Sequence, residues 1–229
     1  FMGLVGSEMC IRDRSLFMCH VASSCLLQGR NVLYITCEMA EEKIAERIDA
    51  NLLDIPIQQL QDPLLTKQKY RAKMDVLKKK TQGKLVIKEY PTASAHVGHF
   101  KALLNELSLK KGFHPEIIFV DYLNICASSR YKGTIVNSYT YVKAIAEELR
   151  GLAGEYNVPI LSATQTTRSG YGNSNVEITD TSESFGLPAT ADLMFALIST
   201  EDMEELNQIM VKQLKNCLLY TSDAADERL

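Results

Sequence analysis

Six short apolar segments, separated by amphipathic or polar stretches, set the hydrophobic pattern of this chain. They occupy residues 31–39, 84–91, 116–125, 158–165, 191–197 and 208–216. Their β-branched and aromatic residues favour extended structure. The segment 116–125 is continuously apolar before its acid, which is typical of a parallel strand buried on both faces. The pattern therefore predicts six strands.

Helical spacing marks the stretches between these strands. Residues 15–30, 94–111 and 139–156 each carry an apolar stripe, and Ile44, Ile48 and Leu52 share one face of a further helix. The polar segment 56–80 also has helical spacing and a basic end, which suits either a solvated helix face or a DNA contact. Alternating strands and helices predict an α/β fold with a mostly parallel central sheet and helices on both faces.

The two ends of the chain do not fit this pattern. Residues 1–14 have no helical or strand period, and residues 5–14 and 218–228 resemble translated sequencing-adaptor read-through. We therefore expect one domain over residues 15–217, preceded by a non-native leader (1–14) and followed by a non-native tail (218–229). A flexible native tag or tail is the alternative, and either interpretation excludes the ends from the fold.

Composition narrows the class of protein. The chain has 229 residues, 46% of them hydrophobic, and a formal net charge of −3, so any nucleic-acid contact must come from local loops. The six cysteines show no C-x-x-C spacing, which favours free thiols in a reducing compartment. No apolar run is long enough to span a membrane. We expect a soluble, cytoplasmic protein without a membrane partner.

Polar side chains end three of the predicted strands. Glu38, Asp121 and Gln165 lie at the expected strand ends within the segments 31–39, 116–125 and 158–165. If these strands are neighbours, the three groups meet at the carboxyl edge of the sheet, where ligands bind in open α/β folds. Nucleotide hydrolysis needs such a set: an acid near Mg²⁺, a carboxylate for water and an amide near the γ-phosphate. Each residue alone is weak, and Asp121 is equally compatible with a turn-forming role.

The combination resembles the RecA-like ATPase domain of DnaB-type replicative DNA helicases, especially those of large tailed phages. The resemblance spans nearly all of residues 15–217. It is carried by YITCEMAEE (34–42), the Walker B-like IIFVDYLNI (117–125), ILSATQTTR (160–168), ESFG with ADLMFAL (183–197) and KQLKN (212–216).

That resemblance implies a RecA-like P-loop NTPase core that uses ATP and Mg²⁺. Glu38 is then the catalytic carboxylate, Asp121 holds Mg²⁺ through water, and Gln165 couples the γ-phosphate to the DNA loops. The expected activity is that of an ATP-driven motor on single-stranded DNA, within a homo-oligomer such as a hexameric ring. A primase and a helicase loader are possible partners, and a phage-encoded protein would work in the host cytoplasm.

The phosphate loop departs from the family pattern G-x-x-x-x-G-K-[ST]. With Ser15 at the final position, Arg14 replaces the Lys, and Asp13 and Glu8 replace the two glycines. An aspartate there repels phosphate, and a non-glycine residue does not readily adopt the tight backbone. We expect Ser15 to be a Mg²⁺ ligand and Arg14 to stand at the nucleotide-binding Lys position, in a chain that binds nucleotide poorly.

The last predicted strand also departs from the family pattern. In these helicases a basic pair after the penultimate strand reaches the neighbouring subunit's ATP site; Lys215 fits its first member, whereas Cys217 stands where an Arg is expected. Lys215 and Lys212 are alternatively ordinary solvent-facing strand residues.

Two loops are candidates for DNA contact. Arg130 and Lys132, with the ring of Tyr131 between them, follow the Asp121 strand, and Arg168 and Tyr171 follow the Gln165 strand. Such clusters can track a backbone and stack on bases, although they also occur in inert surface loops.

Two other functions remain open. One is a different RecA-like DNA-dependent ATPase, of the recombinase or repair type. The other is a RecA-like module that binds DNA or assembles with partners without hydrolysing ATP, which the altered phosphate loop favours.

Overall fold

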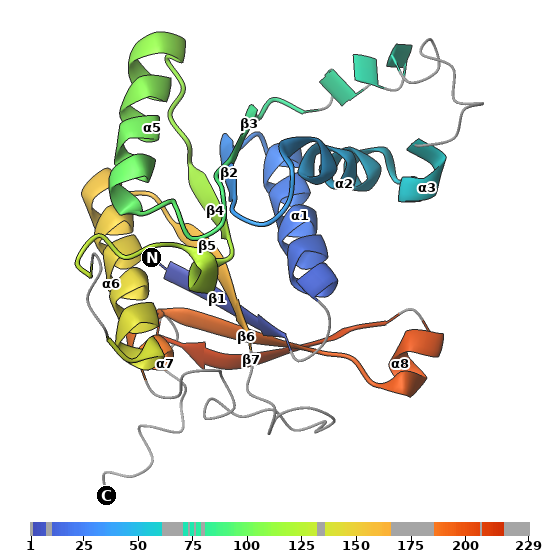
Figure 1. Ribbon diagram of the computed structural model, residues 1–229. Coiled ribbons are helices and arrows are strands. Elements are labelled where there is room, and N and C mark those ends of the chain that lie inside the picture. Colours follow the sequence, from blue (N-terminus) through green and yellow to red (C-terminus); the bar gives the residue numbers. More distant parts are fainter. Residues whose placement is uncertain are drawn as a thin grey trace, which may run out of the picture.

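A single seven-stranded sheet forms the centre of the molecule, with strand order β3-β2-β4-β5-β1-β6-β7 (Figure 1). The computed structural model describes residues 2–7, 11–60, 71–72, 74–75, 77–78, 81–131, 136–165, 186–206 and 208–217. All neighbouring strands are parallel except β6 and β7, which are antiparallel to each other. The strands are β1 (Met2–Ser7), β2 (Val32–Thr36), β3 (Leu85–Glu89), β4 (Ile117–Asp121), β5 (Ile160–Gln165), β6 (Leu193–Ile198) and β7 (Met210–Asn216).

Helices cover both faces of the sheet, as predicted (Figure 1). Leu33 and Ile35 of β2 pack on the side of α5 and α6, whereas Val32 and Tyr34 pack on the side of α1 and α2. This split follows from the alternation of side chains along a strand. The helices are α1 (Ile11–Leu27), α2 (Glu41–Leu53), α3 (Ile57–Leu60), α5 (Val97–Lys111), α6 (Ser138–Tyr156), α7 (Gly186–Thr190) and α8 (Glu201–Glu205), with a 3-10 turn η1 (Leu123–Ile125).

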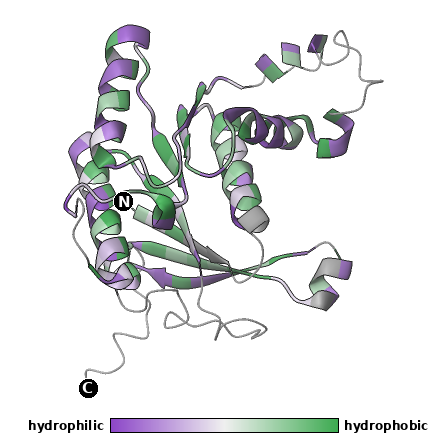
Figure 2. Cartoon of the chain, viewed as in Figure 1, coloured by the Kyte–Doolittle hydropathy of each residue, from purple (hydrophilic) through white to green (hydrophobic). Residues whose placement is uncertain are grey.

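Local sequence explains why the long helices begin and end where they do. The Asn137 side chain accepts a hydrogen bond from the Thr140 amide at 2.8 Å and so caps the start of α6. Asn157 (φ 49°) and Gly112 (φ 55°) end α6 and α5 in the left-handed conformation that these residue types tolerate best. Figure 2 shows the apolar strands between helices whose outer faces are hydrophilic.

The six predicted strands are confirmed, but the expectation that residues 1–14 lie outside the fold is wrong. Met2–Ser7 forms β1 between β5 and β6, and Met2 and Leu4 are fully buried. The helix predicted from residue 15 begins at Ile11. A strand flanked by a partner on each side needs little hydrophobic period of its own, because pairing with those partners fixes its conformation.

Two further differences concern polar segments. The loop predicted over residues 166–190 ends in the short helix α7, while residues 166–185 lie outside the described part of the chain. The predicted helix over 56–80 is described at α3 and at a few later positions. No helix in the described ranges is long and apolar enough to cross a bilayer.

Candidate active site

The carboxyl ends of β2, β4 and β5 lie side by side, which confirms the predicted neighbourhood of their polar residues. Thr36 of β2 is in register with Asp121 of β4, and Glu38 follows two positions later. Val120 is in register with Ser162 of β5, the strand that ends at Gln165. The strand order therefore brings the three polar ends to one edge of the sheet.

Asp121 is the buried acid of this edge, with 2% of its surface exposed. The Tyr34 hydroxyl donates a hydrogen bond to its Oδ2 at 2.9 Å, and the Ser15 hydroxyl on α1 donates another. Burial raises the pKa of Asp121 above its ordinary value, while these two hydrogen bonds oppose the rise. The helix α1 and the strand β4 thus join a hydroxyl and a carboxylate, both oxygen donors that suit Mg²⁺.

Glu38 lies beside this acid on a bend that is held on both sides. The Thr36 Oγ1 accepts from the Met39 amide at 3.1 Å and donates to the Met39 carbonyl at 2.8 Å. The Cys37 amide donates to the Asp121 carbonyl at 2.9 Å. Partial burial, and then the charge of Asp121, raise the pKa of Glu38. A largely exposed carboxylate with a raised pKa is suited to accept a proton from water.

Gln165 and Arg14 meet on one ring. The Gln165 Nε2 donates to the Tyr122 hydroxyl at 3.3 Å. The Arg14 guanidinium lies over the same ring, 4.5 Å from its centroid, with only 2% of the residue exposed. Tyr122 directly follows Asp121, so it connects the end of β5, the start of α1 and the buried acid.

Two buried guanidinium nitrogens near these carboxylates lack a partner. Within the described part of the chain, Nη1 of Arg14 and Nη1 of Arg47 are buried side-chain atoms without a hydrogen bond. Both cations act on Asp121 and Glu38 electrostatically and oppose the rise of their pKa values. Buried donors are nearly always paired in folded proteins. These two therefore fit an anionic ligand such as a phosphate.

Sequence reasoning missed Arg47 and Tyr34. Arg47 lies between Ile44 and Ile48, the buried residues of α2, so a basic residue bordering an apolar stripe was its signal. Tyr34 is the hydroxyl-bearing residue in the middle of the apolar run 32–35. Both signals are common in sequences. The roles of Arg47 and Tyr34 depend on contacts with α1 and β4, which are distant from them in sequence.

The region of the altered phosphate loop is largely helical. Helix α1 begins at Ile11, so Ile11–Asp13 have helical backbone and Arg14 and Ser15 follow in the same helix. Residues 8–10 lie outside the described ranges. A helix in this place offers the positive end of its dipole, but Ile11–Asp13 cannot form the extended curve with which G-x-x-x-x-G-K surrounds phosphates.

Of the other predicted contact residues, the structure describes Lys215 and Arg130. Lys215 donates to the Pro188 carbonyl at 2.7 Å on β7. Four strand intervals of about 4.8 Å separate β7 from β4, so Lys215 is about 19 Å from Asp121 across the sheet. Arg130 forms an ion pair with Glu147 at 2.6 Å in the segment after η1. Lys132, Arg168 and Tyr171 lie outside the described residues.

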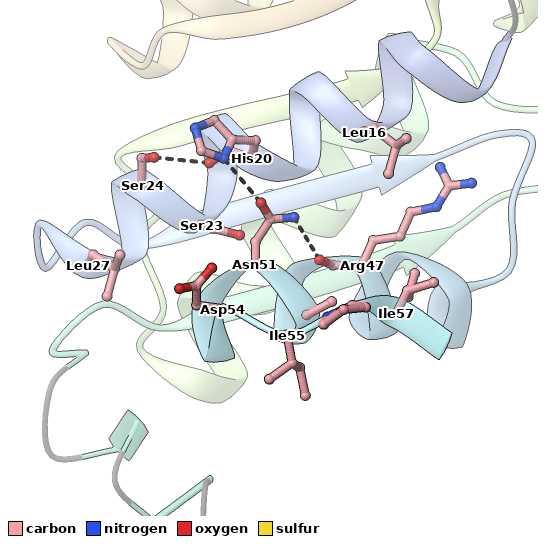
Figure 3. Close-up of a pocket in the computed structure, with 12 residues that line it drawn as sticks. Leu16, His20, Ser23, Ser24, Leu27, Arg47, Asn51, Asp54, Ile55 and Ile57 are labelled. Atoms are coloured by element: carbon pink, nitrogen blue, oxygen red, sulfur yellow. Dashed lines mark hydrogen bonds between the residues drawn. The ribbon is translucent and has the colours of Figure 1, made fainter. Parts of the chain in front are cut away.

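A cavity of about 510 Å³ lies between α1 and the pair α2 and α3 (Figure 3). His20 Nδ1 and Asn51 Oδ1 are hydrogen-bonded at 3.1 Å across it. Arg47 extends along its wall toward the N-terminal part of α1, where Leu16 lies (Figure 3). The cavity therefore borders the candidate site through Arg47, but it contains neither Glu38 nor Asp121.

Comparison with known proteins identifies close relatives. The sequence model of the "DnaB-like helicase C terminal domain" matches residues 12–221. The chain is 48% identical to the DnaB-like replicative helicase of Enterobacteria phage T4 over 204 residues, which cover 89% of this chain and 43% of that protein. It is 25% identical to the replicative DNA helicase DnaB of Helicobacter pylori, over 85% of this chain and 39% of that protein. The chain thus spans less than half the length of these relatives.

Solved structures share the fold. A DnaB-like replicative helicase, studied with its interactions with primase, superposes with a TM-score of 0.75 at 16% identity, over 95% of this chain and 52% of that one. A second solved structure, of an ATPase domain, superposes with a TM-score of 0.74 at 16% identity, over 95% of this chain and 77% of that one. These matches confirm the predicted RecA-like α/β architecture.

Proposed function

The chain belongs to the DnaB-like helicase C-terminal domain family, and on that premise we propose that it is the motor domain of a replicative DNA helicase. The proposed activity is ATP hydrolysis coupled to movement along single-stranded DNA. Its substrates are ATP with Mg²⁺ and a DNA strand. The names of the relatives support the helicase assignment; the residues at the sheet edge support the chemistry.

The observation that carries the proposal is the pairing of Ser15 with Asp121 beside Glu38. A hydroxyl at the start of the first helix and an acid at the end of a neighbouring strand are the two protein groups from which P-loop NTPases hold Mg²⁺. Here they are hydrogen-bonded to each other and buried. If Ser15 and Asp121 served only to stabilise the core, a second carboxylate, Glu38, would not be needed beside them.

The residues present fit Mg²⁺ and a phosphate chain. The Ser15 hydroxyl would bind Mg²⁺ directly and the Asp121 carboxylate would bind it through water, as this hard cation prefers oxygen ligands and retains water. The unpaired Nη1 atoms of Arg14 and Arg47 would bind phosphate oxygens. When bound, Mg²⁺ would neutralise charge on the phosphates.

The remaining residues would act on water and on the γ-phosphate. Glu38 would orient the attacking water and accept its proton, since it projects from the bend beside Asp121. Gln165 would report the presence of the γ-phosphate, because its amide is already linked through Tyr122 to Arg14. Arg47 would stabilise the charge that develops on the transferred group.

This chain binds ATP weakly in our proposal, because residues 8–14 do not supply the glycines and Lys of the phosphate loop. In the sequence pattern, Glu8 and Asp13 replace the two glycines, and an acidic residue at those positions repels phosphate. Arg14 replaces the Lys cation, but it lies in helix α1 and stacks on Tyr122 instead of standing in an extended loop.

Lys215 would act on the neighbouring subunit, because it is far from Asp121 of its own chain. The assembly would be a homo-oligomer such as a hexameric ring, with hydrolysis between subunits. One structural neighbour is described with its interactions with primase, which supports primase as a partner here; a helicase loader is a further candidate.

The test compares Mg²⁺-dependent ATP binding and hydrolysis, with and without single-stranded DNA, in two proteins. The first is this chain, and the second carries Glu8→Gly, Asp13→Gly, Arg14→Lys and Cys217→Arg. We expect DNA-stimulated turnover only in the second. Turnover without any DNA stimulation would favour an ATPase with another role.

One observation favours a second function for the chain as it stands. The helical start of α1 in place of a phosphate loop suits a RecA-like module that binds DNA or assembles with partners without hydrolysis. Failure of both proteins to bind ATP would select that function.

A further inference from the structure

A carboxylate of α6 holds the segment that follows η1. Glu148 is 8% exposed, and its two oxygens accept hydrogen bonds from the Ser128 hydroxyl (2.6 Å), the Ser129 hydroxyl (2.7 Å) and the Ser129 amide (3.0 and 3.1 Å). The Arg130 amide adds a longer contact of 3.4 Å. We call residues 128–130 and this carboxylate the Glu148 clamp.

Neighbouring groups complete the clamp. The Tyr141 hydroxyl accepts from the Ser128 amide at 3.0 Å, one turn after the start of α6. The Ser128 hydroxyl accepts from the Arg130 amide at 3.2 Å. Three consecutive backbone amides are thus fixed to side chains, and two of the acceptors belong to one rigid helix. An ordinary surface turn does not need a buried carboxylate to hold its backbone amides in place.

The Glu148 carboxylate of the clamp is ionised at neutral pH. Burial would raise the pKa of Glu148, but the hydrogen bonds from Ser128, Ser129 and Arg130 outweigh it and the pKa is lowered. Charge-assisted hydrogen bonds are also the stronger kind. The backbone at Arg130 is therefore held firmly while its side chain remains 53% exposed.

Glu147, the residue before Glu148, acts on the same arginine in another way. Its Oε2 lies 2.6 Å from the Arg130 Nη1, and its side chain is 38% exposed. It does not contact the clamped backbone through any hydrogen bond in the described residues. An ion pair between two exposed side chains is weak, so a phosphate can displace Glu147 from the guanidinium.

We propose that Glu148 is a positioning residue for single-stranded DNA: it fixes the backbone at Arg130 so that the guanidinium meets a backbone phosphate, and Glu147 occupies that guanidinium until the phosphate arrives. The inference rests on the proposed helicase function. It predicts that neutralising these two adjacent glutamates has opposite effects on DNA affinity. A change in net charge alone would affect the affinity in the same direction at both positions.

The test uses Glu148→Gln and, as its matched control, Glu147→Gln, because both remove one negative charge from α6. Binding of a fluorescein-labelled oligothymidylate is measured by anisotropy over a range of salt concentrations. We expect Glu148→Gln to weaken binding about tenfold and to reduce the salt slope by about 0.7, the loss of one phosphate contact on a single strand. We expect Glu147→Gln to tighten binding about twofold, the size of a weak exposed ion pair.

The same pair is then measured with Arg130→Gln, to separate positioning from general loss of structure. If Glu148 acts through Arg130, Glu148→Gln has no further effect on affinity in the Arg130→Gln background. Equal weakening in both backgrounds, or equal tightening by both glutamate variants, would overturn the proposal.

Amide hydrogen exchange without DNA tests the clamp itself. We expect the Ser129 and Arg130 amides to be protected in the unchanged chain and to lose protection in Glu148→Gln but not in Glu147→Gln. If the unchanged chain does not bind the oligonucleotide, the helicase function and this inference both fail. If it binds and Glu148→Gln binds equally well, the positioning role alone fails.

Discussion

Replacing Tyr34 by Phe tests whether the buried acid of the site depends on a side chain that would not touch a ligand. Tyr34 is fully buried, and its hydroxyl lies between Asp121 Oδ2 at 2.9 Å and the Cys19 Sγ at 3.8 Å. Its ring stacks on Phe119, with centroids 5.5 Å apart and an interplanar angle of 9°. Phe keeps this stacking and removes one oxygen atom.

The magnitude follows from the two contacts of that oxygen. A hydrogen bond to an ionised group contributes about 1.5–3 kcal/mol, and the thiol contact contributes less. Asp121 also loses one of the two hydrogen bonds that offset its burial. We therefore expect Tyr34→Phe to lower the free energy of unfolding by about 2 kcal/mol at neutral pH.

A double-mutant cycle with Asp121→Asn isolates the contribution of the charge. With a neutral partner the hydrogen bond contributes about 1 kcal/mol, so the two substitutions should be coupled by about 1 kcal/mol. Asp121→Asn alone should not destabilise the fold, because it removes a buried charge whose pKa is raised by burial.

The assay is urea unfolding followed by far-UV circular dichroism, since the chain has no tryptophan to report by fluorescence. Cys19→Ala serves as the control for the thiol contact. An equal loss of stability from Tyr34→Phe in the presence and absence of the Asp121 charge would refute the reasoning. So would a Tyr34→Phe protein as stable as the unchanged chain.

Three other predictions rest on separate features. In the chain with the restored phosphate loop, Glu38→Gln should abolish ATP hydrolysis and leave ATP binding, measured by calorimetry, while exposed Glu42→Gln leaves both; normal turnover would remove Glu38 from the catalytic role. Glu148 has a lowered pKa when folded, so its stabilisation is present above its ordinary pKa and lost as pH falls through the folded value. Glu148→Gln should therefore lower the free energy of unfolding by about 1–3 kcal/mol at pH 7 and by less in acid; a pH-independent difference would contradict this. Leu4→Ala should lower the free energy of unfolding by about 2–5 kcal/mol if β1 is a core strand, whereas Leu109→Ala, 86% exposed, should change it by less than about 0.5 kcal/mol.

The strands that carry the site were predictable because each is written in a local run of residues. Glu38, Asp121 and Gln165 stand where such runs end, and a parallel sheet brings those ends together. β1 was not predictable in the same way, since Gly3 and Gly6 weaken its local strand preference and its conformation comes from pairing with β5 and β6.

The supporting residues of the site were harder to predict. Tyr34 looks like an ordinary strand residue until β4 places Asp121 beside it. Arg47 and Glu148 look like polar residues of amphipathic helices. Arg47 is assigned to the candidate site by an unpaired buried nitrogen, and Glu148 is assigned to the clamp by five hydrogen bonds to a segment 18 to 20 residues away. Such roles depend on tertiary contacts that no local pattern encodes.

The position of β1 has a mechanical consequence. β5 and β6 do not pair with each other, so in the described sheet β1 alone joins the four strands β3, β2, β4 and β5 to the antiparallel pair of β6 and β7, which carries Lys215. Ser7 of β1 is in register with both Gln165 and Leu197. Within the sheet, a displacement of the Gln165 strand would reach β6 and β7 through β1, and helix α6 offers a second route because Arg150 pairs with Asp192 just before β6. β1 therefore links the part of the sheet that would respond to ATP with the part that would contact the next subunit.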